Sequence, residues 1–245
     1  MQDFTKYSPS PQSFGAQQAA LSSEALYFQR IYLWMCAGLS LTAGTAFFLS
    51  SSVAWRQFLL GHQWALYVAI FGTLGLVFFL SARIHSLSPQ AARSLFLAYA
   101  ALNGVTFSVL AMVYQPTAFV KAFICTAGIY GAMAVYGMVT KRSLQAWGSF
   151  LFAGVVGLIL ASLVNIFWHN NTMDLAICVL GVLIFAGLTA YDHQKLRVLR
   201  YSLEGQSGLD ASEQEGRLVV MGALTLYLDF INIFIFLLRL FGRRD

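Results

Sequence analysis

Two aspartates in long apolar segments are the residues of this chain whose types and positions best suit chemistry. Asp229 stands eleven residues into the run LVVMGALTLYLDFINIFIFLLRLF, within one residue of its midpoint. Asp192 ends the preceding apolar segment, in LTAYDHQKLR. Two carboxyl groups held at close range cannot both ionise easily, so such a pair shares a proton. If the fold brings these two together, they would respond to pH and could attract a divalent cation.

The neighbours of Asp229 indicate which way its side chain faces. One small or polar stripe runs along this segment at helical spacings of three, four and three residues: Gly222, Thr225, Asp229 and Asn232. An aspartate at the centre of a membrane helix costs about 2.5–3.5 kcal/mol to insert. We therefore expect the stripe to face the bundle interior or water, with Thr225 and Asn232 as candidate pathway-lining residues. A buried aspartate hydrogen-bonded for structure alone is the alternative.

The composition identifies the elements that must position these residues. Of 245 residues, 58% are hydrophobic and 10% charged, whereas a soluble domain usually has about a quarter charged residues. Apolar runs near the ~20 residues needed to cross a bilayer recur along the chain, and continuous runs favour helices over a barrel. The expected spans are Ile31–Leu49, Ala65–Ala82, Leu95–Tyr114, Ala118–Val139, Trp147–Trp168, Met173–Tyr191 and Leu218–Phe241.

These spans predict an all-α membrane protein, a seven-transmembrane-helix bundle over residues 31–242. Residues 1–30, rich in Gln, Ser and Ala, are expected to form a mobile polar tail. The apolar run that begins at Ile31 is expected to be a retained helix rather than a signal peptide. Residues 192–217 are expected to form a polar, solvated loop between the sixth and seventh helices. The net charge of +5 reflects Lys and Arg at span ends, so we expect a lipid bilayer as partner and no nucleic acid.

Basic residues also predict the orientation. With a cytosolic N-terminus, ten Lys and Arg fall on the cytosolic side and only Arg56 and Lys121 in the opposite loops, as the positive-inside tendency requires. Arg239, Arg243 and Arg244 follow the seventh span and disturb this pattern. The last helix either crosses against the tendency or enters and returns, and the sequence does not decide between the two.

Several segments resemble the Bax inhibitor-1 family, also called the transmembrane BAX inhibitor motif or YccA-like family. They are GALTLYLDFINIFIFLLRLFG, LTAYDHQKLR, YGMVTKRSLQAWGSFLFAGVVGLILASLVNIF and LNGVTFSVLAMVY. The resemblance covers roughly Arg30 to Gly242 and looks closest to members from the bacterial inner membrane. One departure is Ser143, where many members have an acidic residue after TKR.

The resemblance implies a fold in which the C-terminal helix is central and wrapped by the other six. It also implies a di-aspartyl pH sensor, carried here by Asp192 and Asp229, and a pH-sensitive calcium leak. Arg83 occupies the place of an arginine that in some members latches onto the sixth-helix aspartate; an ordinary positive-inside anchor is the alternative. Calcium would be the permeant ion, bound transiently by Asp192 and Asp229, and no tightly bound cofactor is expected.

Two other classes of function compete with a leak channel. Some bacterial relatives are linked to a membrane-bound ATP-dependent protease and eukaryotic ones to cell-death control, so the chain could be a regulatory protein that moves no ions. An intramembrane aspartyl protease is disfavoured because its GxGD motif is absent and Asp229 stands in LYLD; we expect no enzyme. The histidines at 62, 85, 169 and 193 have no metal-ligand spacing, and His193 is expected to be solvated.

Overall fold

The computed structural model describes residues 11–62, 64–83, 86–203 and 209–242, with side chains of 11–22, 202–203 and 209–211 left out of account. These residues form helices and no strand. The helices, in chain order, are α1 (Pro11–Ser51), α2 (Val53–Gly61), α3 (Trp64–Arg83), α4 (Pro89–Val113), α5 (Pro116–Val139), α6 (Gln145–Trp168), α7 (Asn171–Leu203) and α8 (Leu209–Phe241).

Local sequence explains several helix boundaries. Ser88 caps α4 by accepting a hydrogen bond from the Ala91 amide at 3.3 Å, and Pro89 opens the helix where no amide partner is needed. Pro116 opens α5 in the same way. At the end of α6, His169 takes a left-handed conformation, with φ of 48°, which reverses the chain into α7.

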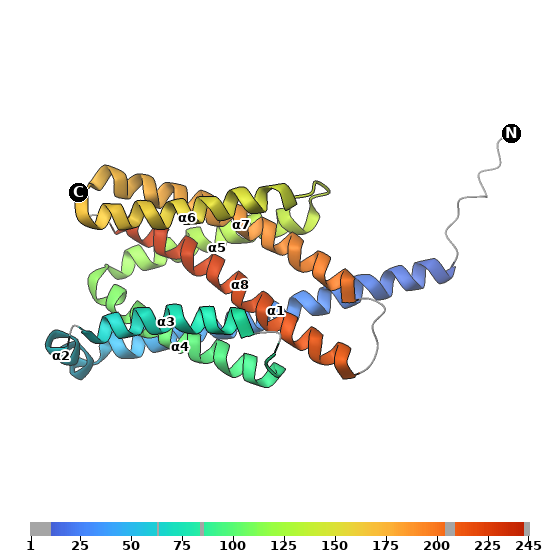
Figure 1. Ribbon diagram of the computed structural model, residues 1–245, viewed down its shortest axis with the longest axis horizontal. Helices are drawn as coiled ribbons and strands as arrows, with labels where there is room; N and C mark the ends of the chain where they lie inside the picture. Colours follow the sequence, from blue (N-terminus) through green and yellow to red (C-terminus); the bar gives the residue numbers. More distant parts are fainter. Residues whose placement is uncertain (1–10, 63, 84–85, 204–208, 243–245) are drawn as a thin grey trace.

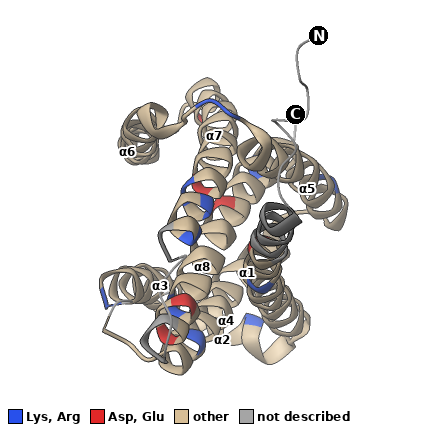
Figure 2. Ribbon diagram, turned by 90° about the vertical axis from the view of Figure 1, so that its right-hand side faces the viewer, with Lys and Arg blue, Asp and Glu red and all other residues tan. Residues whose placement is uncertain are grey.

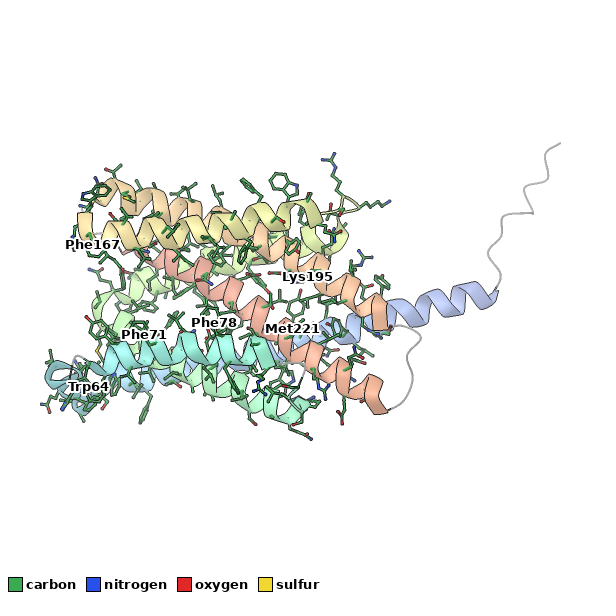
Figure 3. All side chains as sticks on the ribbon, viewed as in Figure 1. Trp64, Phe71, Phe78, Phe167, Lys195 and Met221 are labelled. Carbon is green, nitrogen blue, oxygen red and sulfur yellow. The ribbon has the colours of Figure 1, made fainter. Side chains whose placement is uncertain are left out.

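Seven of these helices are long and apolar enough to cross a membrane, which confirms the predicted fold class. The short helix α2, between the first two of them, was not predicted. Aromatic side chains such as Phe71 and Phe78 on α3 and Phe167 on α6 are exposed on the outer helices (Figure 3). Exposed aromatic surface of this kind is stable against lipid rather than water. The chain is therefore a multi-pass membrane protein.

Helix α8 lies at the centre of the bundle. In its most apolar stretch, 72% of residues are buried inside the protein, against 11–39% for the other six spans. It packs mainly against α1, α4, α5 and α7, while α3 packs outside on α4 and α6 outside on α7 (Figures 1 and 2). The central position expected from the family resemblance is thus present, with four helices rather than six in extensive contact.

The long helices alternate in direction, so α8 ends at the opposite end of the bundle from the start of α1 (Figure 1). The last helix therefore crosses the bundle and does not return. Arg239, in its last turn, forms an ion pair with Asp174 in the first turn of α7. This pairing gives the basic residue a counter-charge at the end of the bundle where α8 finishes.

Two predicted boundaries differ from the structure. Helix α1 begins at Pro11, and Tyr27 and Phe28 are buried in the core, so residues 23–30 belong to the packed bundle and not to a mobile tail; residues 1–10 lie outside the described residues. Helix α7 continues to Leu203 and α8 begins at Leu209. Most of the predicted polar loop 192–217 is therefore helical, because polar residues extend both helices beyond their apolar parts.

A buried network of hydrogen bonds joins α8 to α1 and α4. The Asn103 amide donates to the Tyr227 hydroxyl at 2.9 Å, and that hydroxyl lies 2.7 Å from Oγ1 of Thr42. Thr42 in turn donates to the carbonyl of Ala100 at 2.8 Å. With the hydrogen bonds oriented in this way, every donor has an acceptor. The network therefore stabilises one face of α8 without leaving a buried polar group unsatisfied.

Candidate functional site

The structure brings the two predicted acidic residues together in the bundle interior. Asp192 extends from α7 and Asp229 from α8, and their carboxyl groups lie close enough to act on each other. Asp229 is 4% exposed and Asp192 9% exposed. The expected juxtaposition of two carboxyl groups within the membrane-spanning bundle is thus present.

The hydrogen-bonding groups around this pair favour a proton shared between its two carboxyl groups. Oδ2 of Asp229 is buried, and no N–H or O–H group of the described residues donates to it. Two carboxylates are acceptors only, so a hydrogen bond between them needs one of the carboxyls to be protonated. Burial without a paired cation also disfavours two negative charges. The arrangement fits one proton shared between Asp192 and Asp229.

Charged groups near the pair are few. Lys195, three residues along α7, acts electrostatically on Asp192, but its side chain is exposed (labelled in Figure 3). On the α5 side the buried ring of Tyr130 packs edge-on against Phe230, the residue after Asp229. Its hydroxyl donates to the sulfur of Met35 at 3.3 Å rather than to a carboxyl group.

The contact of α7 with α5 depends on a glycine. A Cβ atom added to Gly137 of α5 would overlap the backbone carbonyl of Ala190, two residues before Asp192. Only a residue without a side chain allows the two backbones to approach this closely. Gly137 therefore sets the position of the turn of α7 that carries Asp192.

His193 is buried, and the prediction that it is solvated was wrong. Its ring lies among Phe28 and Tyr32 of α1 and Tyr130 of α5, stacked on Phe28 with ring centroids 6.2 Å apart. Sequence reasoning missed this residue because it took the α7 segment beyond Tyr191 for a loop. The spacing of four from His193 to Arg197 and on to Tyr201 was a helical signal that could have indicated it.

The other predicted site residues lie apart from the pair. Arg83 is exposed at the end of α3, and within the described residues it forms no ion pair with Asp192. Thr225 and Asn232 flank Asp229 on α8 but are only half-buried, and the Asn232 amide donates to the Leu228 carbonyl of its own helix at 2.8 Å. The latch and pathway roles of these residues therefore remain predictions.

The small number of possible oxygen ligands at the pair also limits metal binding there. Among the described residues no group of three or more His, Cys, Asp or Glu side chains is placed to hold a metal ion. Calcium usually takes six to eight oxygen ligands, so two carboxyl groups with Thr225, Asn232 and backbone carbonyls would make a sparse site. Such a site suits brief passage of a cation better than storage.

Comparison with known proteins decides the family. A family model described as "Inhibitor of apoptosis-promoting Bax1" matches residues 24–245. The chain belongs to this family. The family match begins at Glu24, six residues before the Arg30 boundary expected from the sequence motifs, which agrees with the packing of residues 23–30 into the bundle.

Relatives of this Bax inhibitor family protein are found in several bacteria. It is 44% identical over 229 residues to an uncharacterized protein of Deinococcus radiodurans, covering 94% of this chain and 95% of the relative. It is 41% identical over 218 residues to the inner membrane protein YbhL of Escherichia coli, covering 89% and 92%. An uncharacterized protein of Borreliella burgdorferi is 37% identical over 218 residues, covering 89% and 92%. The family match over residues 24–245 includes both aspartates of the site.

Proposed function

We propose that this Bax inhibitor family protein is a pH-sensitive calcium leak channel gated by the Asp192–Asp229 pair. The observation that carries the proposal is the proximity of these two buried carboxyl groups between α7 and the central helix α8. Intramembrane acids are costly and usually mark ion or proton pathways. Helix α8 could insert without one, because Leu, Ile and Phe surround Asp229.

In the proposed closed state one proton joins the two carboxyl groups. Loss of that proton leaves two adjacent negative charges, whose repulsion pushes α7 and α8 apart in a low-dielectric interior. The same charges then attract Ca²⁺ from water entering between the helices. Leak should therefore increase as the pH rises through the range in which the pair loses its proton.

The proposal places the protein in the bacterial inner membrane with its N-terminus in the cytosol. The name of the Escherichia coli relative gives that membrane, and the distribution of Lys and Arg supports the orientation. Figure 2 shows charged residues, coloured blue and red on the ribbon, gathered along α7, α8 and their neighbours at the end where α1 begins. The acid pair would exchange its proton with water on one of the two sides of the membrane.

Calcium-sensitive dye enclosed in vesicles that contain the purified protein tests this function. External calcium should enter faster than in protein-free vesicles, and its rate should rise with pH. A protein that moves no calcium at any pH is not a leak channel. Retention of a membrane-bound protease by such an inactive preparation would favour the alternative, a regulatory role without ion movement.

A further inference from the structure

One face of α7 binds the N-terminal part of α1 next to the acid pair. His193, Arg197 and Tyr201 follow at spacings of four on α7 and so share a side of the helix. They contact Glu24 and Tyr32 of α1, eight residues apart on one face of that helix. We call this set of five residues the α1–α7 strap.

A carboxylate, a guanidinium group and a tyrosine hydroxyl form the outer part of the strap. Nε of Arg197 lies 3.1 Å from Oε1 of Glu24, and the Tyr201 hydroxyl donates to Oε2 of the same carboxylate at 2.8 Å. Arg197 also donates to the Met138 carbonyl of α5 at 2.7 Å. That carbonyl belongs to the last turn of α5, where it has no partner within its own helix. Arg197 therefore joins α7 to both α1 and α5.

The inner part of the strap is a directed hydrogen-bond chain. Nδ1 of His193 lies 2.6 Å from the Thr189 carbonyl, which can only accept, so Nδ1 carries a hydrogen. In the neutral ring Nε2 is then the acceptor, and the Tyr32 hydroxyl donates to it at 2.9 Å. This bond is the direct polar link between α1 and the residue that follows Asp192.

Side chains provide most of the contact between these two helices. Helix α1 packs extensively on α4 and α8, whereas the backbones of α1 and α7 approach each other at few points. The polar strap residues, with the ring of Phe28 stacked on His193, bridge this gap. Removing one strap bond should therefore loosen α7 without disrupting the main packing of α1.

We propose that the strap is the positioning element of the acid pair: Glu24 and Tyr32 hold the rotation of α7 that directs Asp192 toward Asp229. Successive residues of a helix point about 100° apart, so His193 held against α1 and α5 fixes the direction of Asp192 beside it. This inference rests on the proposed leak function for its physiological meaning. The strap then serves as a second restraint on opening, set by the cytosolic end of α1.

Removal of single strap groups from the full chain tests the inference in calcium-loaded vesicles. Tyr32→Phe deletes only the hydroxyl, and Glu24→Gln removes the charge that pairs with Arg197. At a pH at which the wild-type protein is closed, Tyr32→Phe should raise the leak about fivefold, the effect of one net hydrogen bond on an equilibrium. The double variant should leak more than either single variant.

The matched control is Tyr227→Phe, which deletes a fully buried hydroxyl from the side of α8 that faces α1 and α4. It should leave the closed-state leak within about twofold of wild type. A second measurement, the infrared carbonyl band of the protonated acid pair, assigned by its loss in Asp192→Asn, should shift in Tyr32→Phe and not in Tyr227→Phe. This band reports the geometry of the pair whether or not the protein conducts calcium.

The outcomes separate the two proposals. A wild-type protein without any calcium leak contradicts the channel function, but a band shift in Tyr32→Phe alone still supports the strap. A pH-dependent wild-type leak that Tyr32→Phe and Glu24→Gln leave unchanged, with an unshifted band, overturns the strap and leaves the channel in place. Equal changes in Tyr32→Phe and Tyr227→Phe mean general loosening and also overturn it.

Discussion

Asp192 and Asp229 lie close together across the interface of α7 and α8, although Asp229 follows Asp192 by 37 residues in the chain. Each lies on a membrane-spanning helix, and α8 is the central one. A change in their separation must therefore displace α7 against the helix on which most of the bundle packs. This connection makes the pair suited to control the shape of the whole protein.

Gly137→Ala should destabilise the protein and displace the turn that carries Asp192. The added Cβ would overlap the Ala190 carbonyl, and overpacking of this kind costs about 1–3 kcal/mol. Unfolding by SDS in mixed micelles measures the loss. Gly131→Ala on the same helix is the control, because no atom lies within 4 Å of its added Cβ; it should be neutral or stabilising. Equal stability of both variants would contradict the close approach of α5 and α7.

Tyr227→Phe should lower the stability of the protein because it breaks the buried hydrogen-bond network that joins α8 to α1 and α4. Without the hydroxyl, the buried Asn103 amide loses its acceptor, and an unsatisfied buried donor costs about 1–3 kcal/mol. The same SDS unfolding measures this difference. Tyr136→Phe, whose side chain is exposed, should change stability by less than about 0.5 kcal/mol. If Tyr227→Phe lowers stability no more than Tyr136→Phe does, the hydrogen-bond network contributes nothing to stability.

Reporter fusions should place the two ends of the bundle on opposite sides of the membrane. Seven crossing helices and a cytosolic start of α1 put the end of α8 outside the cytosol. A periplasm-active phosphatase fused after Asp245 should be active, and a cytosol-dependent fluorescent protein at the same place should be dark. Fluorescence from the C-terminal fusion would contradict either the orientation or the odd number of crossings.

Much of the fold could be predicted because hydrophobicity dominates in membranes. Each span from Ala65–Ala82 to Leu218–Phe241 was predicted with boundaries at most twelve residues from those of its helix, since only continuous apolar helices satisfy the backbone in lipid. Polar helical ends were not predicted. Residues 192–203 and 23–30 carry charges that suggest a loop or tail, yet they are helical because they bind each other across the bundle.

The two aspartates of the site could also be predicted from the pattern of hydrophobicity, whereas the neighbouring contacts between α7 and α1 could not. Asp229 was identified because a carboxyl group in the middle of an apolar run is conspicuous, and Asp192 because two such groups can share a proton. His193 and Tyr32 are ordinary in sequence, and their pairing depends on which face of α1 meets α7. The short helix α2 was missed because its nine residues carry no span-length signal.

Calcium flux into vesicles at several pH values, with Asp229→Asn beside the wild type, tests the central claim most directly. Glu213→Gln, a carboxyl-to-amide change at an exposed residue of the same helix, is the matched control. The account predicts a wild-type leak that rises with pH, the same profile in Glu213→Gln, and a leak independent of pH in Asp229→Asn, since that side chain can no longer lose a proton. An unchanged pH profile in Asp229→Asn would remove the acid pair from the gating mechanism.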